Sequence, residues 1–285
     1  MEKPKILTQA KKKVEQVFRK KSAATAAKLG FQGEMLRFLE EEEEDIAWKA
    51  IIYKVPRNIM AWAVRAGTNT LATPDNLGRW GRPVNPKCAL PGCSSVCTLG
   101  HLLSACSKSL DRFAYRHNSV LAHLLKVINE NKGSEIDTYA DLNGFRINNG
   151  TVPPDLCQTS QKPDLLVLDK RYQPAKIYII ELTCPWDSKQ AFQAAVDRKL
   201  SRYERLALDL EEKGYTVFSW PFEVGVRGSL DKRNSVLLET ICNTFNIKAY
   251  KKLKRNLSKI ALVASHRIYL ARASTDWVGG DFITA

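Results

Sequence analysis

The sequence predicts a mixed α/β chain, in which long helices flank short β-strands. Apolar residues recur at helical spacing over residues 111–131 and again along one face of residues 188–213. Between these two segments, the runs PDLLVLD and KIYIIELTC are short, apolar and separated by the turn-like KRYQPA, which is a signal for a β-hairpin. Helix, hairpin and helix in this order indicate a chain with a mixed core.

The N-terminal part is expected to be helical. Residues 5–50 carry basic clusters at 11–13 and 19–21 and an acidic run at 40–45, a pattern typical of a solvated helical face. Residues 55–86 are rich in Pro, Gly and Trp, and we expect loops that form a packed connector.

The later elements follow from their end signals. A helix is predicted from Asp111 to Asn131, and Pro185 ends the second strand of the hairpin. A long helix then runs from about Ser188, with Asp187 favoured as its N-cap over a metal ligand, and Gly214 as its C-cap. The run YTVFSWPFEVGV predicts a further strand, and the last fifty residues predict basic helices.

Composition restricts the class of partner. The 285 residues contain 44 Lys and Arg against 30 Asp and Glu, which gives a net charge of +14. Such an excess favours a polyanion, because cationic contacts with phosphates release condensed counterions. Membrane surfaces are anionic too, but the chain has no long apolar run and its first residues lack the apolar core of a signal peptide. We therefore expect an intracellular protein without a membrane partner.

Four of the seven cysteines lie close together in the sequence, with one histidine among them. The spacing Cys88-x4-Cys93-x7-His101-x4-Cys106 supplies three thiolates and one imidazole, the ligand set of a tetrahedral structural Zn²⁺. Cys97 is an alternative ligand in place of Cys88. The sequence thus predicts a structural zinc site that organises a fold.

The hairpin brings two carboxylates together. A turn centred between Tyr172 and Gln173 pairs residues whose numbers sum to 345, which sets Asp164 opposite Glu181. Two like charges at this distance are costly unless a cation lies between them, and Mg²⁺ binds one or two carboxylates together with phosphate oxygens. By strand alternation Thr183 shares a face with Glu181.

The helix after the hairpin adds a lysine. Its apolar stripe consists of Phe192, Val196, Tyr203, Leu206 and Leu210, and Lys199 falls inside it. A lysine at such a position either extends out to solvent or meets a negative partner, here the carboxylates of the sheet. The alternative places Leu200 inward and Lys199 at the rim.

The order of these motifs resembles the C-terminal region of reverse transcriptases from site-specific non-LTR retrotransposons that carry a restriction-enzyme-like endonuclease. The resemblance covers roughly residues 55–225, and it depends on the whole set because a Pro-Asp pair alone is a weak signal. The motifs in chain order are a Trp-containing connector (TLATPDNLGRW), the Cys-Cys-His-Cys knuckle, Arg116-His117-Asn118, Lys162-Pro163-Asp164, Glu181, and a helix with Lys199 and Tyr203.

This resemblance implies a restriction-endonuclease-like core of element order αβββαβ. Asp164 and Glu181 would bind a catalytic Mg²⁺, and Lys199 and Tyr203 would take part in catalysis. Proteins of such a family nick a chromosomal target, and the freed 3′-hydroxyl primes reverse transcription. The knuckle would help to hold DNA or RNA.

Four further positions are implied as contacts to DNA or as support for the active site. They are Arg116, His117, Asn118 and Lys162. For the His and Asn of this helix, a purely structural capping role is an equal alternative.

The chain departs from the family pattern in two ways. Restriction-type nucleases place a lysine two residues after the second acid, where this chain has Thr183; the resembling endonucleases take theirs from the following helix, which makes Lys199 the counterpart. No segment resembles a polymerase palm with paired catalytic aspartates. We therefore expect a fragment, a domesticated remnant or a misassigned reading frame that does not polymerise DNA.

The expected organisation has four parts. They are a helical N-terminal segment (1–54), a connector with the zinc knuckle (55–110), the endonuclease core (111–228) and basic C-terminal helices (229–285).

The function expected from these motifs is that of a nuclear, Mg²⁺-dependent DNA endonuclease. The alternative is a non-catalytic, zinc-containing module that binds nucleic acid, and a third, weaker hypothesis is a zinc-stabilised adaptor between proteins.

Overall fold

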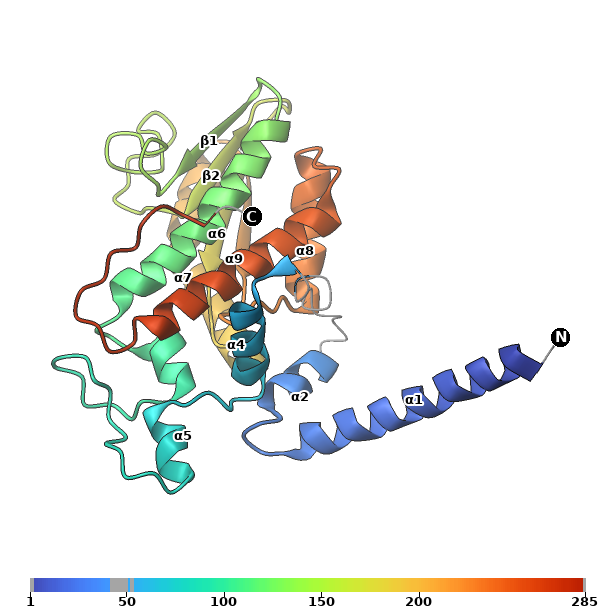
Figure 1. Cartoon of the computed structure of the whole chain (residues 1–285). Helices are drawn as coiled ribbons and strands as arrows, with labels where there is room; N and C mark the ends of the chain where they lie inside the picture. The colour runs from blue at the N-terminus through green and yellow to red at the C-terminus, as the bar shows by residue number, and fades with distance from the viewer. Residues whose placement is uncertain (1–2, 42–50, 52–53, 284–285) are drawn as a thin grey trace.

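The computed structural model describes residues 3–41, 51 and 54–283 (Figure 1). Its main elements in chain order are the helices α1 (Lys3–Lys28), α2 (Glu34–Glu41), α4 (Arg57–Gly67) and α5 (Pro74–Arg79), the π-helix η2 (His101–Ala105), α6 (Leu110–Asn131), the strands β1 (Ile136–Ala140), β2 (Leu165–Asp169) and β3 (Lys176–Thr183), α7 (Lys189–Glu212), β4 (Thr216–Glu223), α8 (Lys232–Thr244) and α9 (Tyr250–Leu270).

The four strands form one mixed sheet in the order β1-β2-β3-β4. Strands β1, β2 and β3 pair antiparallel, whereas β3 and β4 pair parallel. A parallel pair needs a crossover connection, and α7 supplies it. With α6 in front, the elements follow the order α-β-β-β-α-β, and the predicted mixed α/β class is confirmed.

The register of the β2–β3 hairpin decides which side chains meet. Leu165 pairs with Ile180 and Leu166 with Ile179, so the predicted pairing of residues whose numbers sum to 345 is confirmed. Asp164, directly before β2, therefore lies opposite Glu181.

Helices cover both faces of the sheet. Odd-numbered residues of β2 and even-numbered residues of β3 pack in one core with α6, α8 and α9. The opposite side chains of β2 and β3 pack against α7 through Tyr203, Leu206 and Leu210. Alternation along a strand places Asp164 and Glu181 on this second face, toward α7.

The observed boundaries follow the predicted ones closely in the second half of the chain. The helices at 110–131 and 189–212 and the strand at 216–223 all begin and end within three residues of the expected positions. The expectation of loops over 55–86 is wrong in part, because α4 and α5 form there. Trp62 of α4 packs edge-on against His266 of α9 at 5.4 Å between ring centroids, a long-range contact that stabilises the helix.

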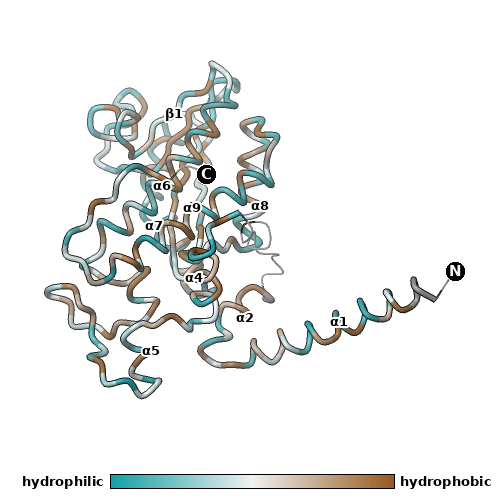
Figure 2. Tube along the Cα trace, in the orientation of Figure 1, coloured by the Kyte–Doolittle hydropathy of each residue, from teal (hydrophilic) through white to brown (hydrophobic). Residues whose placement is uncertain are grey.

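The N-terminal helix α1 projects away from the rest of the molecule (Figure 1). Its residues from Leu7 to Thr25 are exposed, and they are mostly hydrophilic (Figure 2). The following α2 packs against the body, where Phe38 meets Phe192 of α7 at 5.2 Å. Most of the predicted acidic run, residues 42–45, lies outside the described residues.

Within the described part of the chain, no helix combines the length and apolarity that crossing a membrane requires.

Candidate active site and candidate metal centre

Asp164, Glu181 and Lys199 converge between the sheet and α7. The Lys199 Nζ donates to Asp164 Oδ2 at 2.8 Å and to Glu181 Oε2 at 2.7 Å. The hairpin backbone fixes both acids: Asp164 N donates to Glu181 Oε1, and Leu182 N donates to Asp164 Oδ2, each at 2.9 Å. The alternative with Leu200 inward is excluded, since Leu200 is 42% exposed. We call these three residues the acid centre.

The two carboxylates differ in their affinity for a proton. Burial opposes the charge of Asp164, but hydrogen bonds and positive charges from His117 and Lys199 outweigh it and hold the Asp164 pKa below its usual range. Burial and the nearby charge of Asp164 raise the pKa of Glu181 to about 8. Burial also opposes the charge of Lys199, but both carboxylates outweigh it and raise its pKa. A further cation between the two carboxylates would favour the ionised form of both acids.

The helix α6 contributes His117 to this centre. Its Nε2 lies 3.3 Å from Asp164 Oδ2, and its Nδ1 lies 2.9 Å from Asn118 Oδ1. Burial opposes the imidazolium charge, but the Asp164 carboxylate outweighs it and raises the pKa of His117. An imidazolium, with a proton on each nitrogen, satisfies both oxygen acceptors.

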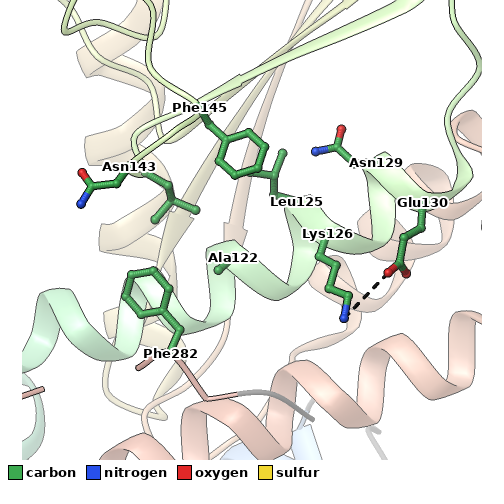
Figure 3. Close-up of a pocket in the computed structure, with 9 residues that line it drawn as sticks. Ala122, Leu125, Lys126, Asn129, Glu130, Asn143, Phe145 and Phe282 are labelled. Atoms are coloured by element: carbon green, nitrogen blue, oxygen red, sulfur yellow. Dashed lines mark ion pairs between the residues drawn. The ribbon is translucent and has the colours of Figure 1, made fainter. Parts of the chain in front are cut away.

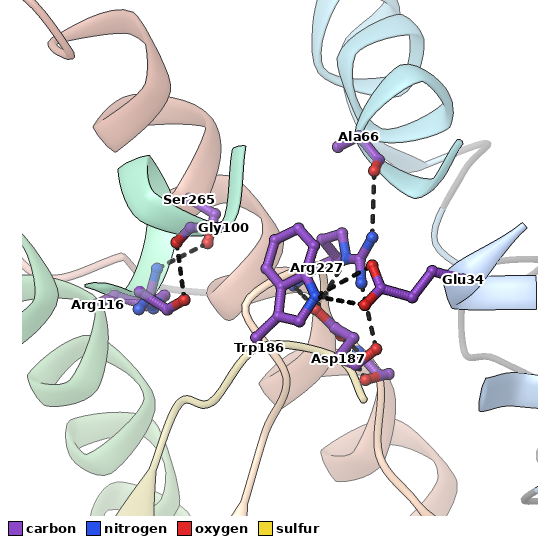
Figure 4. Close-up of polar contacts among 10 residues, drawn as sticks. Glu34, Ala66, Gly100, Arg116, Trp186, Asp187, Arg227 and Ser265 are labelled. Carbon is purple, nitrogen blue, oxygen red and sulfur yellow. Dashed lines mark hydrogen bonds and ion pairs between the residues drawn. The ribbon is translucent and has the colours of Figure 1, made fainter. Parts of the chain in front are cut away.

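Arg116 precedes His117 and points into the body of the protein. It is 1% exposed and donates to Ser265 Oγ of α9 at 3.1 Å (Figure 4). Cys184, which follows β3, lies beside its guanidinium, and the Arg116 Nε has no hydrogen-bond partner among the described residues.

Tyr203 and Lys162 contact each other, but through the backbone of Lys162. The Tyr203 hydroxyl donates to the Lys162 carbonyl at 2.8 Å. Burial is the main reason that the pKa of Tyr203 is raised, so this phenol remains protonated. Tyr203 therefore holds the segment that leads into Asp164, whereas the Lys162 side chain is exposed.

The predicted role of Asp187 as the N-cap of the long helix is wrong. The N-cap is Ser188, whose side chain accepts from Ala191 N. Asp187 is fully buried and pairs with Arg227, with Nε 3.0 Å from Oδ2. The Arg227 guanidinium lies over the Trp186 ring, and the Trp186 Nε1 donates to Glu34 of α2 (Figure 4). This cluster joins the segment after β3 to the N-terminal helices.

A cavity of about 500 Å³ opens beside the acid centre. Residues of α6, the end of β3, α7 and the segment after β1 line it, among them His117, Thr183 and Lys199. A ligand in this cavity can therefore contact Lys199 of the acid centre.

A second cavity, of about 460 Å³, lies along the other part of α6 (Figure 3). Its walls are mainly apolar and include Phe145 and Phe282, while Lys126 and Glu130 form an ion pair of 3.8 Å at one side. None of its lining residues belongs to the acid centre.

The four predicted zinc ligands gather at one point. The ligand atoms of Cys88, Cys93, His101 and Cys106 all lie within 4.8 Å of one another. Cys106 Sγ is 4.0 Å from Cys88 Sγ and 3.9 Å from Cys93 Sγ, and Cys93 Sγ is 3.4 Å from His101 Nε2. Two thiolates on one tetrahedral Zn²⁺, with bonds of about 2.3 Å, lie about 3.8 Å apart. The cluster can therefore hold a metal such as zinc.

The protonation chemistry of this cluster also suits a metal. Burial raises the pKa of Cys88 to about 12, so a nearby cation is needed to keep its thiolate. Burial lowers the pKa of His101, which favours the neutral imidazole that ligates metals. Cys97 is buried nearby but does not belong to the four-residue cluster, so the assignment with Cys88 is the one the geometry supports.

Sequence reasoning missed three features of the site region. The Asp187–Arg227 pair joins residues 40 positions apart and has no local signal. The backbone donor Leu182 N emerges only from the strand register. The arginines at positions 198 and 202, one turn apart beside Lys199, could have been found from their helical spacing.

Comparison of the chain with protein-family models and with curated proteins yields no match to either.

Proposed function

We propose that the chain is a divalent-metal-dependent endonuclease that nicks DNA, with Asp164 and Glu181 as the residues that bind the metal. The observation that carries this proposal is the meeting of two buried carboxylates with the Lys199 ammonium, next to a cavity open to solvent that Lys199 lines. Two acids on a sheet with a cation from the neighbouring helix are the groups that hydrolysis of a phosphodiester requires. The element order α-β-β-β-α-β supports a restriction-endonuclease-like core.

The residues present fit a hard divalent cation. Asp164 Oδ2 and Glu181 Oε2 point at the same Nζ, so they already converge on a positive charge. Mg²⁺ binds through one or two carboxylates and completes its shell with waters and phosphate oxygens. Bound by these two acids, such an ion would act as a Lewis acid toward the scissile phosphate.

Of the remaining groups, one stabilises charge and two position Asp164. Lys199 keeps its proton, so it serves as a donor that stabilises the negative charge of the pentavalent phosphorane and does not act as a general base. His117 and the Tyr203 hydroxyl hold Asp164 in place, His117 at its carboxylate and Tyr203 through the preceding backbone.

In the proposed biological setting, the nick supplies a 3′-hydroxyl that primes reverse transcription by a polymerase on another chain or segment. The zinc knuckle would help to hold DNA or RNA, and the site of action would be the nucleus.

A plasmid-relaxation assay tests the proposal. The purified chain is incubated with supercoiled DNA in Mg²⁺ or in EDTA, next to Asp164→Asn, Glu181→Gln and the matched control Asp155→Asn, which alters an exposed acid of the same β1–β2 segment. We expect relaxation by the parent and the control in Mg²⁺ alone. Loss of activity in the control as well, or cleavage by both site variants, would refute the assignment.

One observation favours a second candidate, a non-catalytic module that binds nucleic acid. Lys199 already provides a hydrogen bond to each carboxylate, so the centre is satisfied without a metal. This candidate predicts salt-dependent binding of DNA or RNA with no Mg²⁺-dependent product.

A further inference from the structure

The cavity beside the acid centre has a cationic mouth. Arg198 and Arg202 line it from α7, one helical turn apart, and Arg146 lines it from the segment after β1. All three side chains are exposed at this mouth. We call these three residues the arginine rim.

The rim charges are mostly not neutralised by the protein. Neither Arg198 nor Arg202 forms an ion pair with a carboxylate in the part of the chain that the structure describes. By contrast, Arg205, about two turns after Arg198 on the same helix, pairs with Asp209 at 2.6 Å. Arg146 pairs with Asp141 through its Nε at 2.7 Å, which leaves its other guanidinium donors available.

The inner wall of the cavity is cationic as well. Arg116 and Lys199 line it, and Asp141 is the one acidic residue among the described lining residues. Arg116 is almost completely buried, with an unpartnered Nε and no carboxylate in ion-pair contact among the described residues. A buried guanidinium without an ionic partner is costly, and an anion that enters the cavity would offset this cost.

The arrangement suits a polyanion that extends past the acid centre. Side chains one helical turn apart have Cβ atoms about 5–6 Å apart, so Arg198 and Arg202 can contact successive groups of a chain of phosphates. A lone phosphate would use only part of this surface, whereas a nucleic-acid backbone meets rim residues on more than one side of the cavity.

We propose that the arginine rim binds backbone phosphates of a DNA strand on either side of the phosphodiester that reaches Asp164 and Glu181. Arg146 holds the strand at the β1–β2 segment, and Arg198 and Arg202 hold it along α7. This assignment rests on the proposed endonuclease function, for which it names the path of the substrate strand.

The test measures how DNA binding depends on salt. Fluorescence anisotropy with a labelled DNA duplex, in EDTA so that cleavage cannot occur, is recorded at several salt concentrations. The variants are Arg146→Gln, the double variant Arg198→Gln/Arg202→Gln, and the control Arg205→Gln. The slope of log K against log salt falls by about 0.9 for each phosphate that the protein no longer neutralises, so the double variant should have a slope smaller by about two. The control should keep the parent slope.

A charge-preserving variant and small anions complete the design. Arg198→Lys/Arg202→Lys should keep most of the slope, because lysine retains the charge. Inorganic phosphate and a mononucleotide should compete with the duplex only at far higher concentration. Competition by inorganic phosphate as strong as by an unlabelled duplex would overturn the proposal in favour of a small-anion site.

The possible outcomes distinguish failure of the rim assignment from failure of the proposed nuclease function. If the parent fails to nick DNA but the rim variants lower the slope, the rim assignment stands and the proposed function fails. If the parent nicks DNA but the slopes of all rim variants equal that of the parent, the rim assignment fails alone. Thermal unfolding and zinc content of each variant show that its fold is retained.

Discussion

The two candidate functions, endonuclease and non-catalytic module, give Lys199 different roles. Its ammonium donates to both Asp164 and Glu181, so it can either accompany a divalent cation or take the place of one. Because the three side chains are largely buried, removal of the ammonium leaves Glu181 without a cationic partner and Asp164 with His117 alone, in a medium that screens charge poorly.

The variant Lys199→Met should therefore destabilise the protein by about 3–5 kcal/mol, the usual cost of removing one partner of a buried ion pair. Millimolar Mg²⁺ should restore part of this loss, because the two acids become a site without a competing ammonium. Thermal unfolding with and without Mg²⁺ measures both effects. The control Lys189→Met changes an exposed lysine on the same helix and should show neither. A variant that loses stability but gains nothing from Mg²⁺ would argue against a metal site.

Glu181 should make stability depend on pH. Its pKa is raised to about 8 in the folded chain by burial and by Asp164. The folded state therefore binds a proton that the unfolded state has released, and the stability this provides is present below the usual carboxyl pKa and is lost as the pH rises toward 8. Melting temperatures in EDTA across this window should fall with pH in the parent and fall less in Glu181→Gln. Parallel curves would contradict the raised pKa.

Among the helices and strands, those features that depend on local sequence patterns were predictable from the sequence. The hairpin register follows from turn position, and the stripe of α7 follows from 3.6-residue periodicity, so the encounter of Asp164, Glu181 and Lys199 was predictable. The helix α4 and the Asp187–Arg227 pair were not, because long-range contacts stabilise them. The strand β1 had no clear signal among the residues, since its interior is only partly buried.

The zinc knuckle gives a prediction about metal content. Cys106→Ser removes a ligand from the four-residue cluster, whereas Cys97→Ser changes a buried cysteine of the same segment that lies outside it. Elemental analysis should find about one zinc per chain in the parent and in Cys97→Ser, and much less in Cys106→Ser. Cys106→Ser should also unfold at lower temperature, because residues 99–106 pack in one core with α4 and α9. Equal zinc in the two variants would contradict the ligand assignment.

Breaking the Asp187–Arg227 ion pair should lower the stability of the protein more than breaking an ion pair on the surface. Both side chains are fully buried, so Arg227→Met leaves the Asp187 carboxylate without its ion-pair partner and should cost about 3–5 kcal/mol. Arg205→Met, which breaks an exposed pair, should cost at most about 1 kcal/mol. Chemical denaturation of the two variants makes the comparison, and similar costs would show that the buried pair does not link the elements as described.

At the scale of the whole molecule, the excess of positive charge is not spread evenly. The projecting α1 is strongly basic and largely exposed, whereas the sheet, α6, α7 and α9 share the buried cores. Charge on an exposed helix affects encounter with a polyanion and has little effect on folding.

Deletion of residues 1–21 should therefore leave the stability of the body unchanged within about 0.5 kcal/mol, the range of ordinary surface changes. The truncation ends before Ala27, whose carbonyl accepts from Arg37 of α2. Thermal unfolding of the truncated and parent chains tests this expectation. A large drop in melting temperature would show that α1 packs against the body.

The rate of plasmid nicking in Mg²⁺ by the parent and by Asp164→Asn, at equal zinc content, decides whether the acid centre cleaves DNA. We expect nicking by the parent, none in EDTA, and a rate for the variant that does not exceed the background. Mg²⁺-dependent nicking by Asp164→Asn at the parent's rate would show that the acid centre is not the site of cleavage.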